Sequence, residues 1–287
     1  MQELQAGCKA NLFLRILGRR SSDGLHQLQS LFYPLSKPRD RILVSRAAPG
    51  KGLELSCTDP ELEGEGNILF QAYQAFAEQS GLKPDLHVHL EKNIPQGAGL
   101  GGGSSDAARL LLFLQENFQE QTKGNIDLAS MACRLGADVS FFLQNRPAWV
   151  EGAGEKITSL VLDLSQFSIL VVWPGIHIST AQAYALWDSS QEQESRHQLQ
   201  YWSLTSKGSG YTNLFPASGR LLWNSFEQVV FDRYPKLQYI KANLLARGAA
   251  AAVLSGSGSA MLGFYRSRPE LESACAYLDM ERIMYFV

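Results

Sequence analysis

The sequence predicts an α/β chain of two lobes. Its 287 residues are 45% apolar and 19% charged, which is a globular composition, and one hydrophobic core stops growing at about 250–300 residues. Strand-like alternation fills the first sixty residues, and a helix-like pattern follows at residues 67–80. A new apolar strand pattern opens near residue 165, directly after a glycine-bearing loop, as happens at a domain change. We therefore expect lobes over residues 1–160 and 161–287, with an α/β (α+β) fold.

The first lobe is expected to begin with strands and turns. Strand patterns cover residues 12–17, 25–33, 41–45, 53–57 and 86–91, and a basic turn is expected at residues 37–40. The helix at residues 67–80 has apolar side chains three and four positions apart, and Gly81 stands where a C-terminal cap belongs. On the last strand His87, His89 and Glu91 share the polar face. Because nothing nearby adds a further ligand, an ordinary half-polar strand is favoured over a metal site.

The second lobe is expected to contain strands and helices in turn. Strands are predicted at residues 165–173, 251–254, 260–265 and 283–287, and helices at residues 218–232, 235–247 and 269–277. Residues 188–210 are rich in Ser, Gln and Glu, which predicts a surface excursion.

Composition argues against several functional classes. The chain has 26 Lys and Arg against 28 Asp and Glu, a formal charge of −2, so charge-driven binding of nucleic acid is not expected. Its apolar runs are far shorter than the ~18 residues that span a bilayer, and its N-terminus lacks the basic start of a signal peptide. Four widely spaced cysteines suit a reducing compartment. A cytoplasmic protein with no nucleic-acid or membrane partner is therefore expected.

The most informative segment is the loop after the strand at residues 86–91. Five of the seven residues at 97–103 are glycine, and a helical pattern follows. Glycine lets backbone N–H groups approach an anion closely, and the helix N-terminus adds the positive end of its dipole. Ser104 and Ser105 suit helix capping or a phosphate or Mg²⁺ contact, and Asp106 suits the first helical turn. The loop therefore predicts phosphate binding.

Two common phosphate-binding patterns do not fit this loop. A dinucleotide-binding unit needs an acid about 20 residues after G-x-G-x-x-G, whereas Gln, Thr and Lys occupy residues 121–123. A P-loop needs Ser or Thr after Gly-Lys, whereas Gly52 follows the Gly-Lys pair at residues 50–51. A third kind of phosphate-binding loop is required.

Three segments occur in an order that identifies such a loop. Residues 95–105 carry a proline, a Gly-Leu-Gly and a Ser-Ser, residues 9–14 read Lys-x-Asn-hydrophobic, and residues 254–259 form a late Gly/Ser turn. Together they resemble the GHMP kinases, the superfamily of galactokinase, homoserine kinase and mevalonate kinase. Asp-Gly-Leu-His at residues 23–26 and Leu-Gly-Ala-Asp-Val at residues 135–139 are similar to the branch that acts on diphosphocytidyl methylerythritol.

The resemblance implies a fold and a reaction. The fold would be a two-lobed kinase with an N-terminal ribosomal-protein-S5-like ATP lobe, a C-terminal ferredoxin-like substrate lobe and an active site in the cleft. The reaction would move the γ-phosphoryl of ATP, with Mg²⁺, to the 2-hydroxyl of diphosphocytidyl methylerythritol, a small-molecule substrate in isoprenoid precursor synthesis. By motif position, Asp138 matches the family's catalytic base and Lys9 its partner. These roles suit the residue types, since a carboxylate can accept the hydroxyl proton and an ammonium can stabilise developing negative charge. Metal ligands stay unassigned, and a monomer or weak homodimer is expected.

The resemblance also implies which residues bind the two substrates. The ATP side would comprise Pro95, Gly97, Gly99, Leu100, Gly101, Gly102, Gly103, Ser104, Ser105, Asn67 and Lys92. The acceptor side would comprise Asn11, His26, Thr180, Tyr184, Gly256 and Ser257. One departure is Leu25, which replaces the family's aromatic residue before the histidine, so the cytosine would lose one stacking face.

Two other functions stay open at this point. Another small-molecule GHMP kinase, such as a homoserine or mevalonate kinase, would share the glycine loop, but residues 23–26 favour a cytidine nucleotide. An RNA-associated protein could have related lobes and use the locally basic residues 15–46, but the net charge of −2 argues against it. A solvated face is the favoured interpretation of that basic segment.

Overall fold

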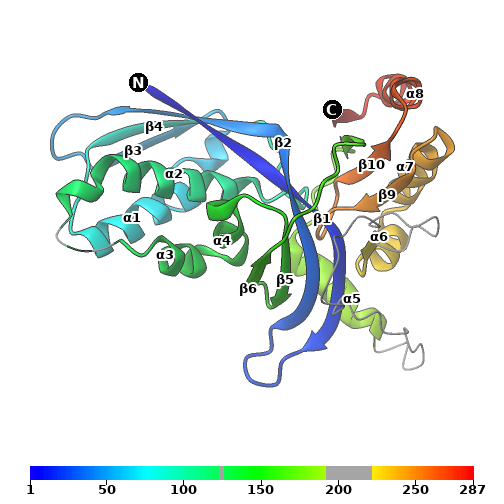
Figure 1. Ribbon diagram of the computed structural model, residues 1–287, viewed down its shortest axis with the longest axis horizontal. Coiled ribbons are helices and arrows are strands. Elements are labelled where there is room, and N and C mark those ends of the chain that lie inside the picture. The colour runs from blue at the N-terminus through cyan, green and yellow to red at the C-terminus, as the bar shows by residue number, and fades with distance from the viewer. Residues whose placement is uncertain (123, 125, 192–221) are drawn as a thin grey trace. The chain divides into compact units, whose positions relative to one another are not determined.

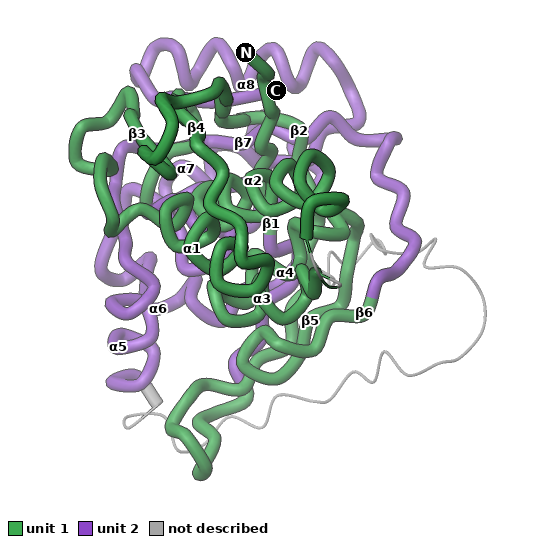
Figure 2. Tube along the Cα trace, turned by 90° about the vertical axis from the view of Figure 1, so that its left-hand side faces the viewer, with its two compact units in different colours: residues 1–10, 17–96, 100–158 green, residues 11–16, 97–99, 159–287 purple. Residues whose placement is uncertain are grey.

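A computed structural model describes residues 1–122, 124, 126–191 and 222–287. The chain divides into two compact units, which Figure 2 shows in different colours. Unit 1 comprises residues 1–10, 17–96 and 100–158, and unit 2 comprises residues 11–16, 97–99 and 159–287. Two short segments from the first half of the chain thus belong to unit 2. The lobe boundary predicted at residue 160 stays a proposal.

Unit 1 is built on a mixed β-sheet. Its strands are β1 (Gln2–Arg19), β2 (His26–Arg46), β3 (Leu53–Cys57), β4 (Leu86–Glu91), β5 (Ala148–Gly152) and β6 (Lys156–Ser159). They lie in the order β3-β4-β2-β1, with β5 paired to β2 and β6 paired to β5. Strand β4 is antiparallel to β2 and parallel to β3, which makes the sheet mixed.

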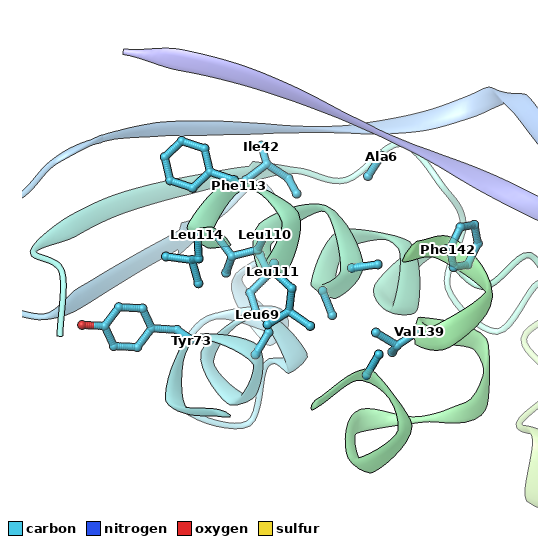
Figure 3. Close-up of a cluster of buried hydrophobic side chains, with 14 of the residues drawn as sticks. Ala6, Ile42, Leu69, Tyr73, Leu110, Leu111, Phe113, Leu114, Val139 and Phe142 are labelled. Carbon is cyan, nitrogen blue, oxygen red and sulfur yellow. The ribbon is translucent and has the colours of Figure 1, made fainter. Parts of the chain in front are cut away.

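The described helices of unit 1 enclose its core against this sheet (Figure 1). They are α1 (Ile68–Ser80), α2 (Gly102–Phe118), α3 (Leu128–Leu135) and α4 (Ala137–Gln144), with 3₁₀ turns at Pro60–Leu62 and Gln119–Gln121. In Figure 3, Leu69 of α1, Leu110 of α2 and Ile42 of β2 are among the buried side chains of this core. Apolar residues recur three and four positions apart on α1 and α2, so one stripe of each helix is buried.

The ends of α1 follow from local sequence. The Asn67 side chain caps its start by accepting the Leu69 N–H at 2.9 Å, and Gly81 ends it in the left-handed conformation with a φ of 71°. Asparagine and glycine are favoured at these two positions because one supplies an acceptor and the other lacks a Cβ. The helix predicted at residues 67–80 is confirmed, and so are the strands predicted at residues 53–57 and 86–91.

Unit 2 is built on an antiparallel sheet with the described order β11-β7-β10-β9. Its elements are β7 (Ser168–Trp173), α5 (Thr180–Gln191), β8 (Trp223–Asn224), α6 (Glu227–Arg233), α7 (Pro235–Ala246), β9 (Ala251–Leu254), β10 (Met261–Tyr265), α8 (Arg268–Met280) and β11 (Met284–Phe286). Strand β8 pairs with β1 at residues 13–14. The helices α5, α6 and α7 come between β7 and β9, and α8 comes between β10 and β11. Apart from the two additional helices in the first connection, the chain order and the sheet order match the ferredoxin-like β-α-β-β-α-β arrangement. The expected C-terminal topology is confirmed.

Several boundaries predicted from sequence are wrong. The strand predicted at residues 12–17 is only part of the 18 residues of β1. The turn predicted at residues 37–40 lies inside β2, since Asp40, Ile42 and Val44 are all buried and continue one face of the strand at period two.

Two predictions in the second half reach beyond the described residues. The helix predicted at residues 218–232 begins later, because Trp223 and Asn224 form β8 and α6 starts at Glu227. Residues 218–221 lie outside the description. Of the excursion predicted at residues 188–210, the first four residues belong to the end of α5 and the others lie outside the description.

No described helix is both long enough and apolar enough to cross a bilayer. The cysteines at positions 8, 57, 133 and 275 are free thiols.

Candidate active site

Lys9 and Asp138 form an ion pair within unit 1. The Lys9 Nζ lies 3.5 Å from Asp138 Oδ2, with side chains that are 6% and 31% exposed respectively. The ammonium also lies 4.5 Å from the centre of the Phe32 ring, a favourable cation–π distance. Strand β1 positions Lys9, and the first turn of α4 positions Asp138. A nearly buried cation therefore faces a carboxylate that remains accessible.

The glycine loop adjoins this pair. The Lys9 N–H donates to the Leu100 carbonyl at 2.9 Å. A Cβ on Gly101 would lie 3.2 Å from Lys9 Cγ and 3.0 Å from the Phe142 ring, so the loop backbone passes directly against the lysine. Gly101 is also the N-cap of α2, and no side chain caps the helix there. The first N–H groups of α2 are therefore available to an anion.

The residues after Gly101 form the first turn of α2. Gly102 and Gly103 open the helix, and Ser104 and Ser105 follow inside it. The helix-capping role considered for the two serines is therefore wrong, because the cap lies before them. Ser104 is partly exposed, whereas Ser105 is buried. Ser104 is the serine that an anion at this helix end could reach.

The first part of the loop packs on the Gly/Ser turn within unit 2. After the partly buried Pro95, Gly97 and Gly99 have φ values of 60° and 73°. The Ser255 hydroxyl donates to the Gly99 carbonyl at 3.1 Å, and a Cβ on Gly99 would lie 2.1 Å from the Ser255 carbonyl oxygen. The Ser259 N–H donates to the Gly97 carbonyl at 3.3 Å. Only glycine fits both the conformation and the close approach at Gly99.

Four of the predicted acceptor-side residues lie around the same turn in unit 2. The backbone N–H of Asn11 donates to the Ser255 hydroxyl at 3.3 Å. A Cβ on Gly256 would lie 3.1 Å from Asn11 Oδ1. The hydroxyls of Thr180, at the start of α5, and Ser257 are 3.3 Å apart. The structure therefore brings these four residues into one polar cluster.

The two remaining acceptor-side residues belong to different units. Tyr184 of α5 packs edge-on against Phe226, with 5.0 Å between ring centres. His26 opens β2 after a turn in which Asp23 accepts the Leu25 N–H at 3.0 Å. The Leu25 side chain is 51% exposed. Binding of a cytosine by Tyr184 and His26 stays a prediction.

Asn67 and Lys92, predicted on the ATP side, both have structural partners. Besides capping α1, Asn67 donates from Nδ2 to the Leu62 carbonyl at 2.7 Å. Lys92 is 10% exposed and lies between two buried carboxylates, those of Asp40 and Asp106. Any contact of Asn67 or Lys92 with ATP stays a prediction.

The Asp40–Lys92–Asp106 network has one ammonium for two carboxyl groups. Burial raises the pKa of Asp106 to about 8, Lys92 opposes that rise, and Asp40 adds to it. Burial works to lower the pKa of Lys92, but Asp106 and Asp40 outweigh it and the pKa is raised. Lys92 therefore stays charged at neutral pH, while Asp106 stays protonated.

Sequence reasoning missed Asp40 and Asn224. Asp40 was assigned to a turn, although its period-two spacing with the apolar Ile42 and Val44 could have placed it on the buried face. The Asn224 side chain is 3% exposed. Its Nδ2 donates to the carbonyls of Leu254 and Gly256, each at 2.7 Å. No local pattern could reveal those long-range bonds.

Asn224→Ala is expected to destabilise unit 2 by about 2–3 kcal/mol, because two buried carbonyls lose their donor. Urea denaturation measures the change in free energy of unfolding. The Gly256 carbonyl would also lose the hydrogen bond that fixes its position. Because Gly256 is one of the predicted acceptor-side residues, the KM for the acceptor should rise. As a control, Asn243→Ala removes a partly buried amide that donates to the Tyr239 carbonyl of its own helix and accepts from Arg247 four residues later, and it should cost less, about 1 kcal/mol.

Polar side chains on β4 bond to the neighbouring strands. His89 shares a hydrogen bond with the Ser56 hydroxyl at 2.8 Å, and Glu91 accepts from Arg41 at 2.7 Å. Within the described part of the chain, no three His, Cys, Asp or Glu residues are placed to hold a metal. In the locally basic segment, Arg20 pairs with Asp23 and Glu155.

Comparison with known proteins gives the family. The sequence matches the GHMP kinases N terminal domain over residues 67–146 and the GHMP kinases C terminal domain over residues 213–279. It is 40% identical over 275 residues to the 4-diphosphocytidyl-2-C-methyl-D-erythritol kinase of Solidesulfovibrio magneticus, covering 96% of this chain and 92% of the relative. The chain belongs to this kinase family. The 4-diphosphocytidyl-2-C-methyl-D-erythritol kinase of Chlorobium limicola is 38% identical over 268 residues, which are 93% of this chain and 89% of the relative.

Solved structures agree with membership of the 4-diphosphocytidyl-2-C-methyl-D-erythritol kinase family. A crystal structure of 4-(cytidine 5'-diphospho)-2C-methyl-D-erythritol kinase has a TM-score of 0.73 at 32% identity, over 97% of this chain and 96% of the other. The homoserine kinase of Cytophaga hutchinsonii has a TM-score of 0.65 at 14% identity, over 100% of this chain and 93% of the other, and shows the shared fold alone. The predicted GHMP kinase fold is confirmed.

Proposed function

We propose that this chain transfers the γ-phosphoryl group of ATP to the 2-hydroxyl of 4-diphosphocytidyl-2-C-methyl-D-erythritol. Family membership supports the reaction. The structural observation that carries it is the Lys9–Asp138 ion pair, 3.5 Å apart and directly against the loop at Gly101. A carboxylate, an ammonium and an uncapped helix N-terminus are the groups that phosphoryl transfer to an alcohol requires.

Asp138 has the role of proton acceptor in this proposal. The O–H bond of the 2-hydroxyl breaks and its proton goes to the Asp138 carboxylate. The freed oxygen forms a bond to the γ-phosphorus, and the bond from that phosphorus to the oxygen bridging it to the β-phosphate breaks, so ADP leaves. Lys9 orients Asp138 and stabilises the negative charge on the transferred group.

The glycine loop has the role of phosphate cradle. The N–H groups at the start of α2, together with the Ser104 hydroxyl, would donate to the phosphate oxygens, and the helix dipole favours the anion. Mg²⁺ typically binds one or two carboxylates and the substrate phosphates, so it needs no cage of protein ligands. Mg²⁺ would neutralise phosphate charge when bound. No protein ligand is assigned to it, since a metal-bound Asp138 carboxylate could not serve as the proton acceptor.

Acceptor recognition is assigned to the polar cluster of unit 2 and to His26. Asn11, Thr180, Gly256 and Ser257 offer amide, hydroxyl and backbone groups for the diphosphocytidyl part. Tyr184 offers a ring for the pyrimidine. With Leu25 in place of an aromatic residue, stacking is expected from one side only, and base stacking is typically worth about 1–3 kcal/mol. The expectation of a cytoplasmic monomer or weak homodimer stays a prediction.

A coupled ADP-release assay across three acceptors tests the proposal. Diphosphocytidyl methylerythritol is expected to be phosphorylated with a kcat/KM at least 10³-fold above those for homoserine and mevalonate, since buried polar groups that lose their partner discriminate by 10⁴–10⁵-fold in favourable cases. Mass spectrometry should find one added phosphate on the acceptor. Preference for homoserine or mevalonate would overturn the acceptor assignment, and ADP release independent of any acceptor would overturn the transferase activity.

A further inference from the structure

A buried charge network lies in unit 1 next to the glycine loop, and the proposed reaction does not use it. Asp40 of β2, Lys92 after β4 and Asp106 of α2 have side chains that are 0%, 10% and 2% exposed. The Lys92 ammonium donates a hydrogen bond to Asp106 Oδ2 at 2.9 Å and another to Asp40 Oδ2. Removing charges from water costs free energy, so a buried ion pair often adds little to stability. Stability alone therefore does not account for this network.

Asp40 holds the segment that leads into the loop. Its Oδ1 accepts the N–H groups of Asn93 at 2.5 Å and Ile94 at 2.8 Å. A Cβ on Gly102 would lie 2.9 Å from Ile94 Cγ2 and 3.3 Å from Lys92 Nζ. The isoleucine and the ammonium therefore limit where the first turn of α2 can lie.

Asp106 connects the network to the helix itself. It is 1% exposed, and its Oδ1 has no hydrogen-bond partner among the described residues. A neutral carboxyl group tolerates an unpaired buried oxygen better than an ionised one. Burial also raises its pKa to about 8. A protonated Asp106 beside a Lys92–Asp40 ion pair makes the network neutral overall at neutral pH.

We propose that Asp40, Lys92 and Asp106 form a positioning network that holds the first turn of α2 in the geometry that binds the ATP phosphates, and that the network is neutral when it does so. The inference rests on the proposed function, since ATP is the ligand. Loss of the Asp106 proton would place a net negative charge next to the helix end that receives the phosphates. That charge would repel them.

The titratable groups that face Asp106 are Lys92, Asp40 and Cys57 of β3. Burial raises the pKa of the Cys57 thiol above its ordinary value of 9.0, so the thiol stays neutral while Asp106 titrates. The Lys92 ammonium stays charged over the same range, because its pKa is raised as well. A change in ATP affinity between pH 7 and 9 therefore reports on Asp106.

Calorimetric titration with ATP and Mg²⁺, without acceptor, tests the proposal at pH 7.0 and pH 9.0. The unchanged chain is expected to lose about tenfold in ATP affinity at the higher pH, as one uncompensated nearby charge requires. Asp106→Asn, which has the size of the protonated acid and cannot ionise, should show no such loss. Arg41 follows Asp40 in the sequence and forms surface ion pairs with Glu3 and Glu91. Arg41→Gln removes these pairs and should show the same loss of ATP affinity as the unchanged chain. An equal loss in Asp106→Asn would overturn the proposal.

Lys92→Met gives a second measurement. It removes the ammonium that links the two carboxyl groups, so the KM for ATP should rise tenfold or more with a smaller change in kcat, and Lys92→Arg should restore part of the affinity. A folded Lys92→Met chain with unchanged ATP affinity would also overturn the proposal. If Lys92→Met does not fold, the pH comparison with Asp106→Asn decides alone.

Stability against pH provides a readout independent of ATP. The folded-state pKa of Asp106 is raised from an ordinary 3.8 to about 8, so the folded chain binds this proton more tightly than the unfolded chain. The free energy of unfolding contributed by Asp106 is thus largest below pH 4 and falls as the pH rises to about 8. In urea denaturation, Asp106→Asn should lack this fall. A parallel pH dependence in the two chains would mean that Asp106 is already ionised, which would overturn the neutral network.

Failure of the network and failure of the proposed function are distinguishable. If the unchanged chain binds ATP but does not phosphorylate the diphosphocytidyl acceptor, the acceptor assignment fails and the calorimetric comparison still decides on the network. If the unchanged chain does not bind ATP at either pH, both the proposed function and the network's role are overturned.

Discussion

Asp138→Asn is expected to lower kcat by about 10²–10⁴-fold, the usual contribution of a general base, with little change in ATP affinity. Asparagine keeps the size of the side chain but cannot accept the hydroxyl proton. The fold should tolerate the change, because Asp138 is 31% exposed and loss of its charge near the start of α4 costs about 0.3–1 kcal/mol. Single-turnover kinetics with saturating ATP measures the chemical step.

Lys9→Met is the companion variant. It keeps an apolar stem against Phe32 and removes the charge 3.5 Å from Asp138 Oδ2, so kcat should fall by a similar order. Because the two residues act as a unit, the double variant should be little slower than either single variant. Arg268→Gln, which breaks the exposed pair with Glu272, should keep full activity. Full turnover by Asp138→Asn would rule out the base assignment.

Gly101→Val is expected to abolish measurable ATP binding. The Cβ would lie 3.0 Å from the Phe142 ring and 3.2 Å from Lys9 Cγ, and the two methyl groups of valine would add to that crowding. The loop backbone would have to move away from Lys9 at the N-cap of α2. A positive φ also costs a residue with a side chain about 1–2 kcal/mol. Calorimetric titration with ATP and Mg²⁺ measures the affinity.

Gly81→Val provides a matched control for Gly101→Val. Gly81 has the same φ of 71° at the end of α1, but a Cβ there would meet nothing within 4 Å. The Gly81→Val variant should therefore lose about as much stability as Gly101→Val and keep its ATP affinity. An unchanged ATP affinity in the Gly101 variant would contradict the phosphate-cradle role of the loop. An equal loss of affinity in the Gly81 and Gly101 variants would point to global destabilisation.

Elements with strong local signals were predictable. The helix α1 has an asparagine cap, a regular apolar stripe and a terminal glycine within fifteen positions, so nearby residues alone set its bounds. The strand β4 alternates cleanly and was predicted at its observed residues. By contrast, β2 passes through two prolines and several charged residues that are typical of turns. Its continuity depends on pairing with β4 and β5, which no local pattern reveals.

In the candidate site, too, some features were predictable from local sequence and others depended on the tertiary structure. A glycine-rich loop between a strand and a helix predicts an anion site by itself, because the positive φ values and the free N–H groups are local properties. Motif resemblance then named Lys9 and Asp138. Neither the spacing nor the composition could show that Lys9 also packs against Phe32 and Gly101, since those contacts arise when β1, β2 and the loop fold together.

The amino-acid sequence by itself determined the family, the two-lobed α/β class and the phosphate-binding character of residues 97–103, because each depends on short motifs or on local periodicity. Only the tertiary structure decided the partners of Lys92. From sequence alone, a lysine after a strand is interpreted as a surface or ligand-binding group. In the structure, Lys92 lies between Asp40 of β2 and Asp106 of α2. Burial of charge is a property of the packed core, and it sets the protonation state of Asp106 in a way that no single segment can encode.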